Sequence, residues 1–177
     1  MKTHALFLAA SAAALLAAAP PALAWSQQQS QATPSQKQFL TKAIQGDNSE
    51  IELGRLAQRQ ARSDQVRQFA NTLVDDHTKA RDEATKVAQN LGVTPPDGVM
   101  PDAAQESAKL RNMSGIGFDR EFVSYMVKDH KKDIADFKKE ANDHHGPVGQ
   151  LAQKQLPTLE KHLKIAESLS DQRISRR

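Results

Sequence analysis

Three histidines and one glutamate have the residue types and the spacing to do chemistry. Glu50, His77, His130 and His162 each fall on the inward, largely apolar face of a different predicted helix. Histidine is costly to bury without a partner, so each imidazole needs an explanation. Imidazoles and a carboxylate together suit one divalent transition-metal ion such as zinc, iron, manganese or copper. The sequence therefore predicts a candidate site for a single metal ion.

The spacing also predicts that these four side chains lie at one height. A helix rises about 1.5 Å per residue, so His77 lies roughly 20 Å from the turn that joins its helix to the helix of Glu50. Glu50 lies a similar distance before that turn, and His130 and His162 lie comparably far from the turn between their own helices. The small residues that leave room beside Glu50 on its helix face are Ala43, Gly46, Gly54 and Ala57.

A metal-free interpretation of the same residues stays open. A single core histidine is most simply satisfied by a neighbouring carboxylate or carbonyl, and the whole set could form a buried polar network around Glu50. Asp76 and Asp129 each precede a histidine but point about 100° away, so we interpret them as supporting partners or surface salt bridges. Tyr125 is interpreted as ordinary packing. A metal-free cluster would make stability strongly pH-dependent, whereas a filled site would be insensitive until its ligands protonate.

Four long helices must position these residues. Apolar residues at three- and four-residue spacing predict helices over 35–61, 64–91, 118–142 and 147–170. Ser35, with Gln38 three residues later, is the predicted N-cap of the first helix, and Ser63 is that of the second. Valine, isoleucine and threonine are sparse and never alternate, so no strand is predicted.

The connections predict how the helices pair. Very short turns join the first two helices and the last two, so each pair must form an antiparallel hairpin. Residues 92–117 are interrupted by proline and glycine and allow one short helix over 102–113, capped by Asp102. This long connection can return the chain to its starting end. The sequence therefore predicts an all-α, ferritin-like antiparallel four-helix bundle with a long crossover, whose last helix is kinked at Pro157.

The first 24 residues predict export from the bacterial cytoplasm. Lys2 and His4 precede an apolar run of about fifteen residues, which is too short for a comfortable membrane span. Ala22-Leu23-Ala24 supplies the small-x-small pattern that signal peptidase needs, so we expect cleavage after Ala24 and a periplasmic mature protein. An uncleaved membrane anchor is the alternative.

Composition limits the mature protein further. The 177-residue chain has no cysteine, so neither a disulfide nor a lipid anchor on cysteine can form. Without residues 1–24, 23 basic side chains face 21 acidic ones, an excess too small to predict nucleic-acid binding. No membrane span is predicted after processing. The expected segments after the signal are a flexible leader over 25–34, the bundle domain over 35–170 and a basic disordered tail over 171–177.

Four stretches of the chain resemble one bacterial family. They run from Glu50 to Ala57, from Phe69 to His77, from Phe118 to His130 and from Leu156 to Leu163. The family comprises exported domains of unknown function, often labelled as outer membrane proteins and assigned to the ferritin-like fold. The resemblance covers about residues 36–170 and implies the fold and an envelope location, but little about activity. Phe122 stands where a tyrosine is expected in that family, so no role for a tyrosine is carried over.

A di-iron site of the ferritin type is disfavoured. Such sites use paired Glu-x-x-His motifs, in which both residues share one helix face. The residues three positions before the three histidines are Val74, Val127 and Leu159. The carboxylates that would bridge two irons are therefore missing from these motifs, and one ion is the most that the pattern predicts.

Three functions are compatible with the sequence. The first is a periplasmic metal-binding bundle in metal homeostasis or envelope stress. The second is a non-catalytic module that binds an envelope protein or a second copy of itself, with its core histidines in a metal-free polar network. The third is a metalloenzyme with an open coordination position, although the sequence shows no Ser/His/Asp arrangement and no phosphate-binding loop.

Overall fold

The computed structural model describes residues 31–143 and 145–174. The expected signal peptide over 1–24 and most of the expected leader over 25–34 lie outside the described residues. Within the described residues, the helices are α1 (Pro34–Gln60), α2 (Asp64–Asn90), α3 (Pro101–Leu110), α4 (Gly115–Asp143) and α5 (Pro147–Ile174). None of these helices is both long enough and apolar enough to cross a membrane.

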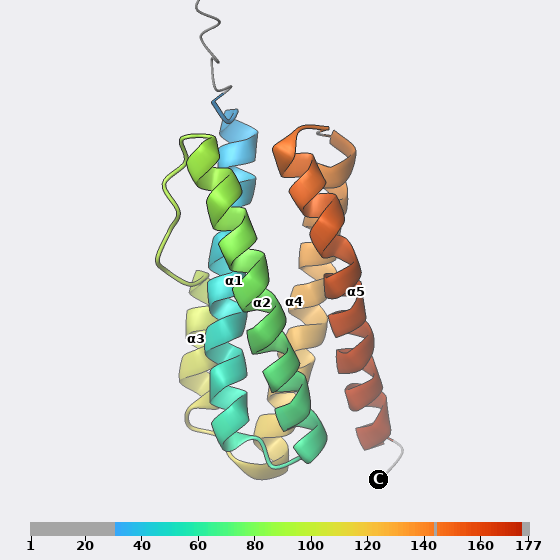
Figure 1. Ribbon diagram of the computed structural model, residues 1–177. Helices are drawn as coiled ribbons and strands as arrows, with labels where there is room; N and C mark the ends of the chain where they lie inside the picture. Colours follow the sequence, from blue (N-terminus) through green and yellow to red (C-terminus); the bar gives the residue numbers. More distant parts are fainter. Residues whose placement is uncertain (1–30, 144, 175–177) are drawn as a thin grey trace, which may run out of the picture.

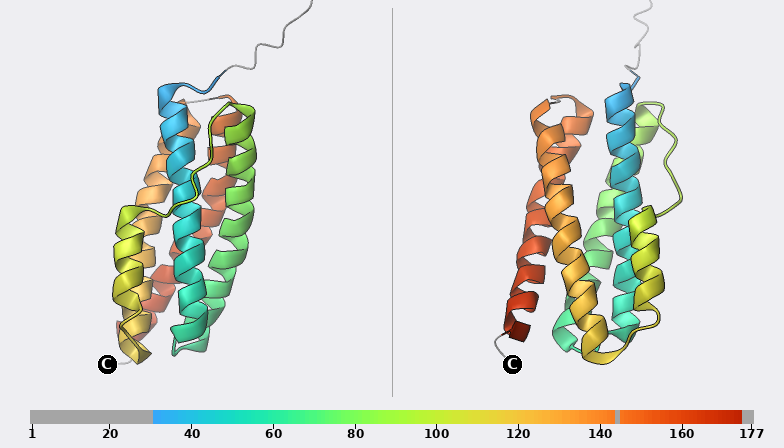
Figure 2. Two further views of the ribbon diagram at one scale, coloured as in Figure 1. Left: turned by 90° about the vertical axis from the view of Figure 1, so that its left-hand side faces the viewer. Right: turned by 180° about the vertical axis from the view of Figure 1, so that it is seen from behind.

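Two helical hairpins pack side by side. Figure 1 shows α1 against α2 and α4 against α5, with the crossover and the short helix α3 on the outer side of α1. The backbone N–H of Ala32 donates to the carbonyl of Leu91 at the end where α1 begins, and Ala61 pairs with Gly115 at the opposite end. The crossover therefore carries the chain back along the bundle, so α4 runs in the same direction as α2 (Figure 2). The all-α, ferritin-like bundle with a long crossover is confirmed.

The helix ends differ from the predicted ones in physically clear ways. The N-cap of α1 is Thr33 rather than Ser35, because Pro34 is already suited to the first helical position. The hydroxyl of Thr33 accepts from the N–H of Gln36, whose side chain accepts in return from the N–H of Thr33. Gly92 ends α2 as predicted, with a positive φ of 70°.

Three other boundaries also differ. The short helix α3 begins at Pro101 after Met100, so Asp102 lies inside its first turn instead of capping it. The helix α4 begins at Gly115, whose φ of 62° turns the chain into the helix. The helix α5 runs unbroken through Pro157 to Ile174, beyond the predicted boundary at residue 170, so residues 171–174 of the predicted tail are helical. Residues 175–177 lie outside the described residues.

The polar segment over 45–50 in the middle of α1 is continuous helix, although it contains Gly46. Asn48 donates through its side chain to the carbonyl of Gly98 at 3.2 Å, and the hydroxyl of Ser49 accepts from the N–H of Met100 at 2.8 Å. These contacts attach the crossover to the outer side of α1. They leave the adjacent Asp47 and Glu50, both buried, on the inner side.

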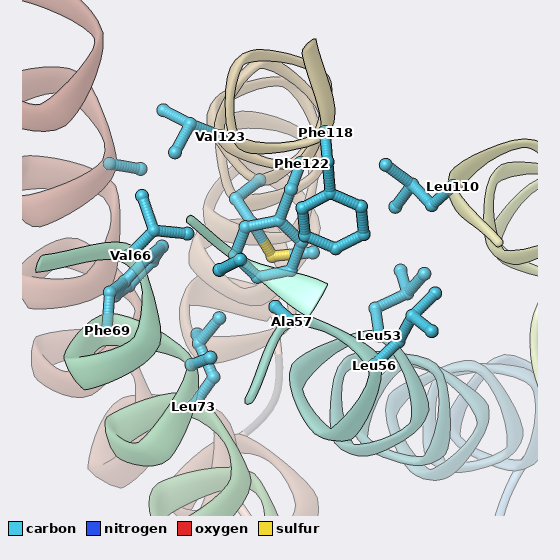
Figure 3. Close-up of a cluster of buried hydrophobic side chains, with 14 of the residues drawn as sticks. Leu53, Leu56, Ala57, Val66, Phe69, Leu73, Leu110, Phe118, Phe122 and Val123 are labelled. Carbon is cyan, nitrogen blue, oxygen red and sulfur yellow. The ribbon is translucent and has the colours of Figure 1, made fainter. Parts of the chain in front are cut away.

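The apolar core is divided along the bundle. A large cluster fills the end near the α1–α2 turn, where Phe69, Phe118 and Phe122 pack with leucines and valines of several helices (Figure 3). Two smaller clusters fill the other end, around Leu40 and Phe137. The buried polar residues of α1, α2, α4 and α5 lie between these clusters, so a polar layer interrupts the core.

Gly54 sets the distance between α1 and α2 beside this layer. A Cβ atom on Gly54 would lie 2.8 Å from Val74 Cγ2 and 3.3 Å from the carbonyl oxygen of Ala70. The helix α2 therefore fills the space beside Gly54. This differs from the expectation that the small residue leaves open room beside Glu50. The close approach brings α2 within reach of the Glu50 carboxylate, one turn away.

Asp119 fixes how the first hairpin meets α4. Its carboxylate is buried, and its two oxygens accept the backbone N–H groups of Arg62 and Ser63 in the α1–α2 turn, both at 2.9 Å. Ser63 makes no side-chain cap, so Asp119 supplies acceptors for this turn. The register between the hairpin and α4 sets where the histidine of α4 lies relative to α1 and α2.

We predict that Asp119→Ala lowers the free energy of unfolding by about 3 kcal/mol, because two partly buried backbone N–H groups lose a charged acceptor. Asp119→Asn should lose less, since the amide keeps one oxygen acceptor. Urea denaturation measures both, with Asp136→Ala at an exposed site on the same helix as the control. Equal effects of Asp119→Ala and Asp136→Ala would contradict this role.

Candidate metal centre

The four predicted site residues converge in the polar layer. Glu50 on α1, His77 on α2, His130 on α4 and His162 on α5 are at most 3% exposed. The three imidazole centroids lie 5.1 to 5.8 Å apart. One ring nitrogen from each histidine lies within 4.8 Å of the other two. The sequence therefore identified a real cluster, with one residue from each long helix.

In each histidine, one ring nitrogen faces a hydrogen-bond acceptor outside the cluster, and we call it the outer nitrogen. His77 Nδ1 lies 2.8 Å from Asp47 Oδ1, and His162 Nε2 lies 3.1 Å from Asp76 Oδ2. His130 Nδ1 donates to the backbone carbonyl of Met126 at 3.0 Å. A carbonyl or an ionised carboxylate can only accept, so these outer nitrogens carry the protons. A neutral imidazole held in this way presents a lone pair on its other nitrogen.

The other ring nitrogen of each histidine, which we call the inner nitrogen, faces the cluster and has no hydrogen bond among the described residues. His77 Nε2, His130 Nε2 and His162 Nδ1 are buried and have no hydrogen bond among the described residues. Both carboxylate oxygens of Glu50 are also buried and have no hydrogen bond among the described residues. Glu50 Oε2 lies 2.8 Å from His77 Nε2 and 3.5 Å from His130 Nε2. The shorter contact is an ion pair by distance, yet its angles are not those of a hydrogen bond.

The pKa values of the three imidazoles shift in different directions. Burial lowers the pKa of His130, while burial and the two neighbouring imidazoles lower the pKa of His162 to about 4. Burial also acts on His77, but Glu50 and Asp47 outweigh it and hold its pKa well above the usual value. Burial would raise the pKa of Glu50, but the imidazoles lower it to about 2. Without a metal ion, a charged His77 therefore faces an ionised Glu50, beside two neutral imidazoles.

Asp47 is the supporting residue that the sequence analysis missed. It is buried on α1, one turn before Glu50, and its Oδ1 faces His77. Burial raises its pKa to about 6. The signal was present in the spacing, because Asp47 continues the three-and-four stripe from Ala43 to Glu50. The neighbouring Gly46 and Asn48 have low helix propensity and make this stripe harder to recognise.

The two aspartates that precede histidines have different roles. Asp76 supports a histidine, as one of the two interpretations of it proposed, but its partner is His162 on α5 instead of its neighbour His77. Asp129 makes no hydrogen bond to any of the three cluster histidines, whose described hydrogen bonds go to Asp47, Met126 and Asp76. One oxygen of Asp129, one of Asp133 and one of Glu50 lie within 4.8 Å of one another. Asp133 was not predicted as part of the site.

Two clefts lead from the surface towards this layer. One, of about 230 Å³, lies between α1 and α4 and is lined by Gly46, Tyr125, Asp129 and Asp133. The other, of about 180 Å³, is lined by His77 and Asp133 among other residues. Burial and the charge of Glu50 raise the pKa values of Asp129 and Asp133 well above the usual carboxyl value. The two clefts therefore approach the buried cluster from different sides, one beside Asp129 and the other beside His77.

The arrangement meets the chemical requirements of a metal site. Bonds of about 2.0 to 2.1 Å to a tetrahedral ion place neighbouring donor atoms about 3.4 Å apart. The 3.5 Å between Glu50 Oε2 and His130 Nε2 matches that spacing. The three imidazole nitrogens lie within 4.8 Å of one another, so each pair exceeds that spacing by at most about 1.4 Å. The described chain thus has a buried histidine and carboxylate cluster that could hold a metal ion.

Comparisons with known proteins agree with the fold. The sequence profile of a family described as "Domain of unknown function (DUF4142)" matches residues 21–169. Among solved structures, the chain is similar to a DUF305 fragment from Deinococcus radiodurans, with 19% identity and a TM-score of 0.72. That match covers 80% of this chain and 99% of the fragment, and at this identity it shows the fold alone. No curated protein sequence is significantly similar to the chain.

We predict that His162 makes the metal-free protein sensitive to acid. Its pKa of about 4 when folded lies below its value of about 6.5 when unfolded, so the unfolded chain binds more protons between these pH values. Stability from neutral His162 is therefore present above about pH 6.5 and lost towards pH 4. Relative to His162→Gln, the wild type should lose about 3 kcal/mol over that range.

Urea denaturation of chelator-treated protein at several pH values measures this difference. His145→Gln, at an exposed site in the α4–α5 turn, is the matched control and should follow the wild type. A constant difference between wild type and His162→Gln from pH 7 to pH 4 would show that His162 does not titrate in this way.

Proposed function

The chain belongs to the family described as a domain of unknown function (DUF4142), and we propose that its polar layer binds one divalent transition-metal ion. The proposed ligands are Glu50, His77 Nε2, His130 Nε2 and His162 Nδ1. One observation carries the proposal: three buried imidazole nitrogens point inward without hydrogen bonds, while each outer nitrogen holds an acceptor. Outer acceptors that fix the tautomer and orientation of a ligating histidine are typical of metal sites.

The proposed ligand set limits the metal and its chemistry. Three imidazoles and one carboxylate suit zinc, iron, manganese or copper, and four ligands complete a tetrahedral shell. Such a closed shell favours holding an ion over turnover, so we propose a role in metal homeostasis or envelope stress. The N-terminal sequence pattern supports export and cleavage after Ala24, which would make the periplasm the source of the metal.

A second candidate function follows from the same contacts. Charged His77, held between Asp47 and ionised Glu50, already forms a paired network without a metal ion. In that case the polar layer would only specify the packing of the bundle, and the protein would act through its outer faces on an envelope partner or a second copy. The inner nitrogens of His130 and His162 favour the metal-binding proposal, because this network leaves both of them without a hydrogen bond among the described residues.

We predict that untagged, chelator-treated protein binds about one equivalent of Zn²⁺ and melts at a higher temperature when loaded. His130→Gln should weaken binding at least tenfold, because a buried ligand is lost without removing a charge at neutral pH. Isothermal titration calorimetry and thermal melting test both statements. His145→Gln is again the control and should bind as the wild type does.

The outcomes separate the two candidate functions. Less than about a tenth of an equivalent of Zn²⁺ bound, with no change in melting temperature, would exclude the metal-binding proposal. The metal-free network would then explain the buried histidines. Binding that is equal in wild type and His130→Gln would place the ion elsewhere on the protein.

We further predict that Zn²⁺ binding at pH 7 releases about one proton. His77 is the source, because Glu50 and Asp47 hold it protonated in the metal-free state and a ligating nitrogen must lose its proton. Calorimetry in buffers of different ionisation enthalpy counts the released protons. Asp47→Asn removes one of the charges that raise the pKa of His77, so this variant should release fewer. Release of no proton by the wild type would show that His77 is neutral.

A further inference from the structure

A second group of possible ligands adjoins the histidine cluster on the α4 side. One carboxylate oxygen from each of Glu50, Asp129 and Asp133 lies within 4.8 Å of the other two. Asp129 and Asp133 are four residues apart on α4 and therefore share one face of that helix. This group was not predicted from the sequence, because helical spacing places Asp129 only relative to the neighbouring His130 and does not show that Asp133 approaches Glu50.

The Oε1 atom of the buried Glu50, which has no hydrogen bond and no ion pair among the described residues, provides a second sign that this group holds a ligand. Glu50 is 0% exposed, and neither of its oxygens has an aligned hydrogen bond among the described residues. Its Oε2 is the oxygen that contacts the inner nitrogens of His77 and His130. The second oxygen, Oε1, has no such contact among the described ion pairs. A carboxylate can bind one ion through each oxygen, so Glu50 can serve both groups.

Ion pairs compensate little of the carboxylate charge on this side of the layer. The nearest cation that the described residues provide for Asp133 is Lys132, whose exposed ammonium lies 3.8 Å away. This contact contributes little, since the Lys132 ammonium is about half-exposed and keeps much of its water. Three carboxylates within one small volume repel one another unless a cation lies between them or protons neutralise them.

The cleft between α1 and α4 gives an ion a route to these oxygens. Asp129 and Asp133 line it together with Tyr125, and Gly46 lies opposite them on α1. A Cβ atom on Gly46 would lie 3.6 Å from Asp133 Oδ2, so the absence of a side chain keeps this carboxylate accessible. The cleft volume of about 230 Å³ also leaves room for water ligands.

We propose that Glu50, Asp129 and Asp133 form a second cation site, which rests on the proposed function because it shares Glu50 with the histidine centre. Its ligands are all carboxylate oxygens, supplemented by water, so it would take a hard divalent cation such as Mn²⁺. In sites where one group bridges two metal ions, the ions lie about 3.5 to 4 Å apart. The layer would then hold a nitrogen-rich site and an oxygen-rich site in contact.

The test uses two metals in sequence on the full mature protein. One equivalent of Zn²⁺ is bound first, and Mn²⁺ is then added while electron paramagnetic resonance measures the free aqueous ion. Mn²⁺ does not displace Zn²⁺ from imidazoles, because divalent zinc binds such ligands more tightly. We expect about one equivalent of Mn²⁺ to bind to the wild type. Asp129→Asn and Asp133→Asn should each weaken Mn²⁺ binding at least tenfold and leave Zn²⁺ stoichiometry unchanged.

Asp136→Asn is the matched control, because Asp136 lines the same cleft but lies outside the carboxylate group. Its Mn²⁺ binding should equal that of the wild type, and circular dichroism melting confirms that each variant is folded. Zn²⁺ binding without Mn²⁺ binding would overturn the second site alone. Mn²⁺ binding that survives both aspartate substitutions would also overturn it. Failure to bind Zn²⁺ would instead reject the proposed function.

Discussion

The structure depends on the burial of three imidazoles and their carboxylates in the middle of a helical core. Unpaired polar groups at such depth cost stability, and a bundle without cysteine has no disulfide to compensate. The outer nitrogens of the histidines are satisfied by Asp47, Asp76 and the carbonyl of Met126. The inner nitrogens are not, and this asymmetry is what a bound ion would resolve. Stability and function therefore meet in one layer.

The rest of the fold holds that layer in register. Apolar clusters pack above and below it, and Asn48 and Ser49 attach the crossover to the outer side of the same segment of α1. Gly54 lets α1 and α2 approach closely, and Asp119 joins their turn to the beginning of α4. Each of these contacts lies away from the imidazoles, yet each limits how far their helices can shift.

Much of this arrangement could be predicted from the sequence. Helical periodicity and short turns were enough to find both hairpins, and counting residues from the turns was enough to bring Glu50 and His130 together. The supporting residues were harder to find, because they depend on contacts between helices. Asp76 binds a histidine on α5, which no spacing within α2 reveals. Asp133 approaches Glu50 only because of how α4 is rotated against α1.

The most direct test of the central claim is a crystal structure of the Zn²⁺-loaded protein with anomalous diffraction recorded at the zinc absorption edge. The account predicts one strong peak among the four helices, bonded to His77 Nε2, His130 Nε2, His162 Nδ1 and Glu50 at about 2.0 to 2.2 Å. The mixed use of Nε2 and Nδ1 follows from the observed outer partners. No peak in this layer, or a peak bonded to the outer nitrogens, would contradict the account.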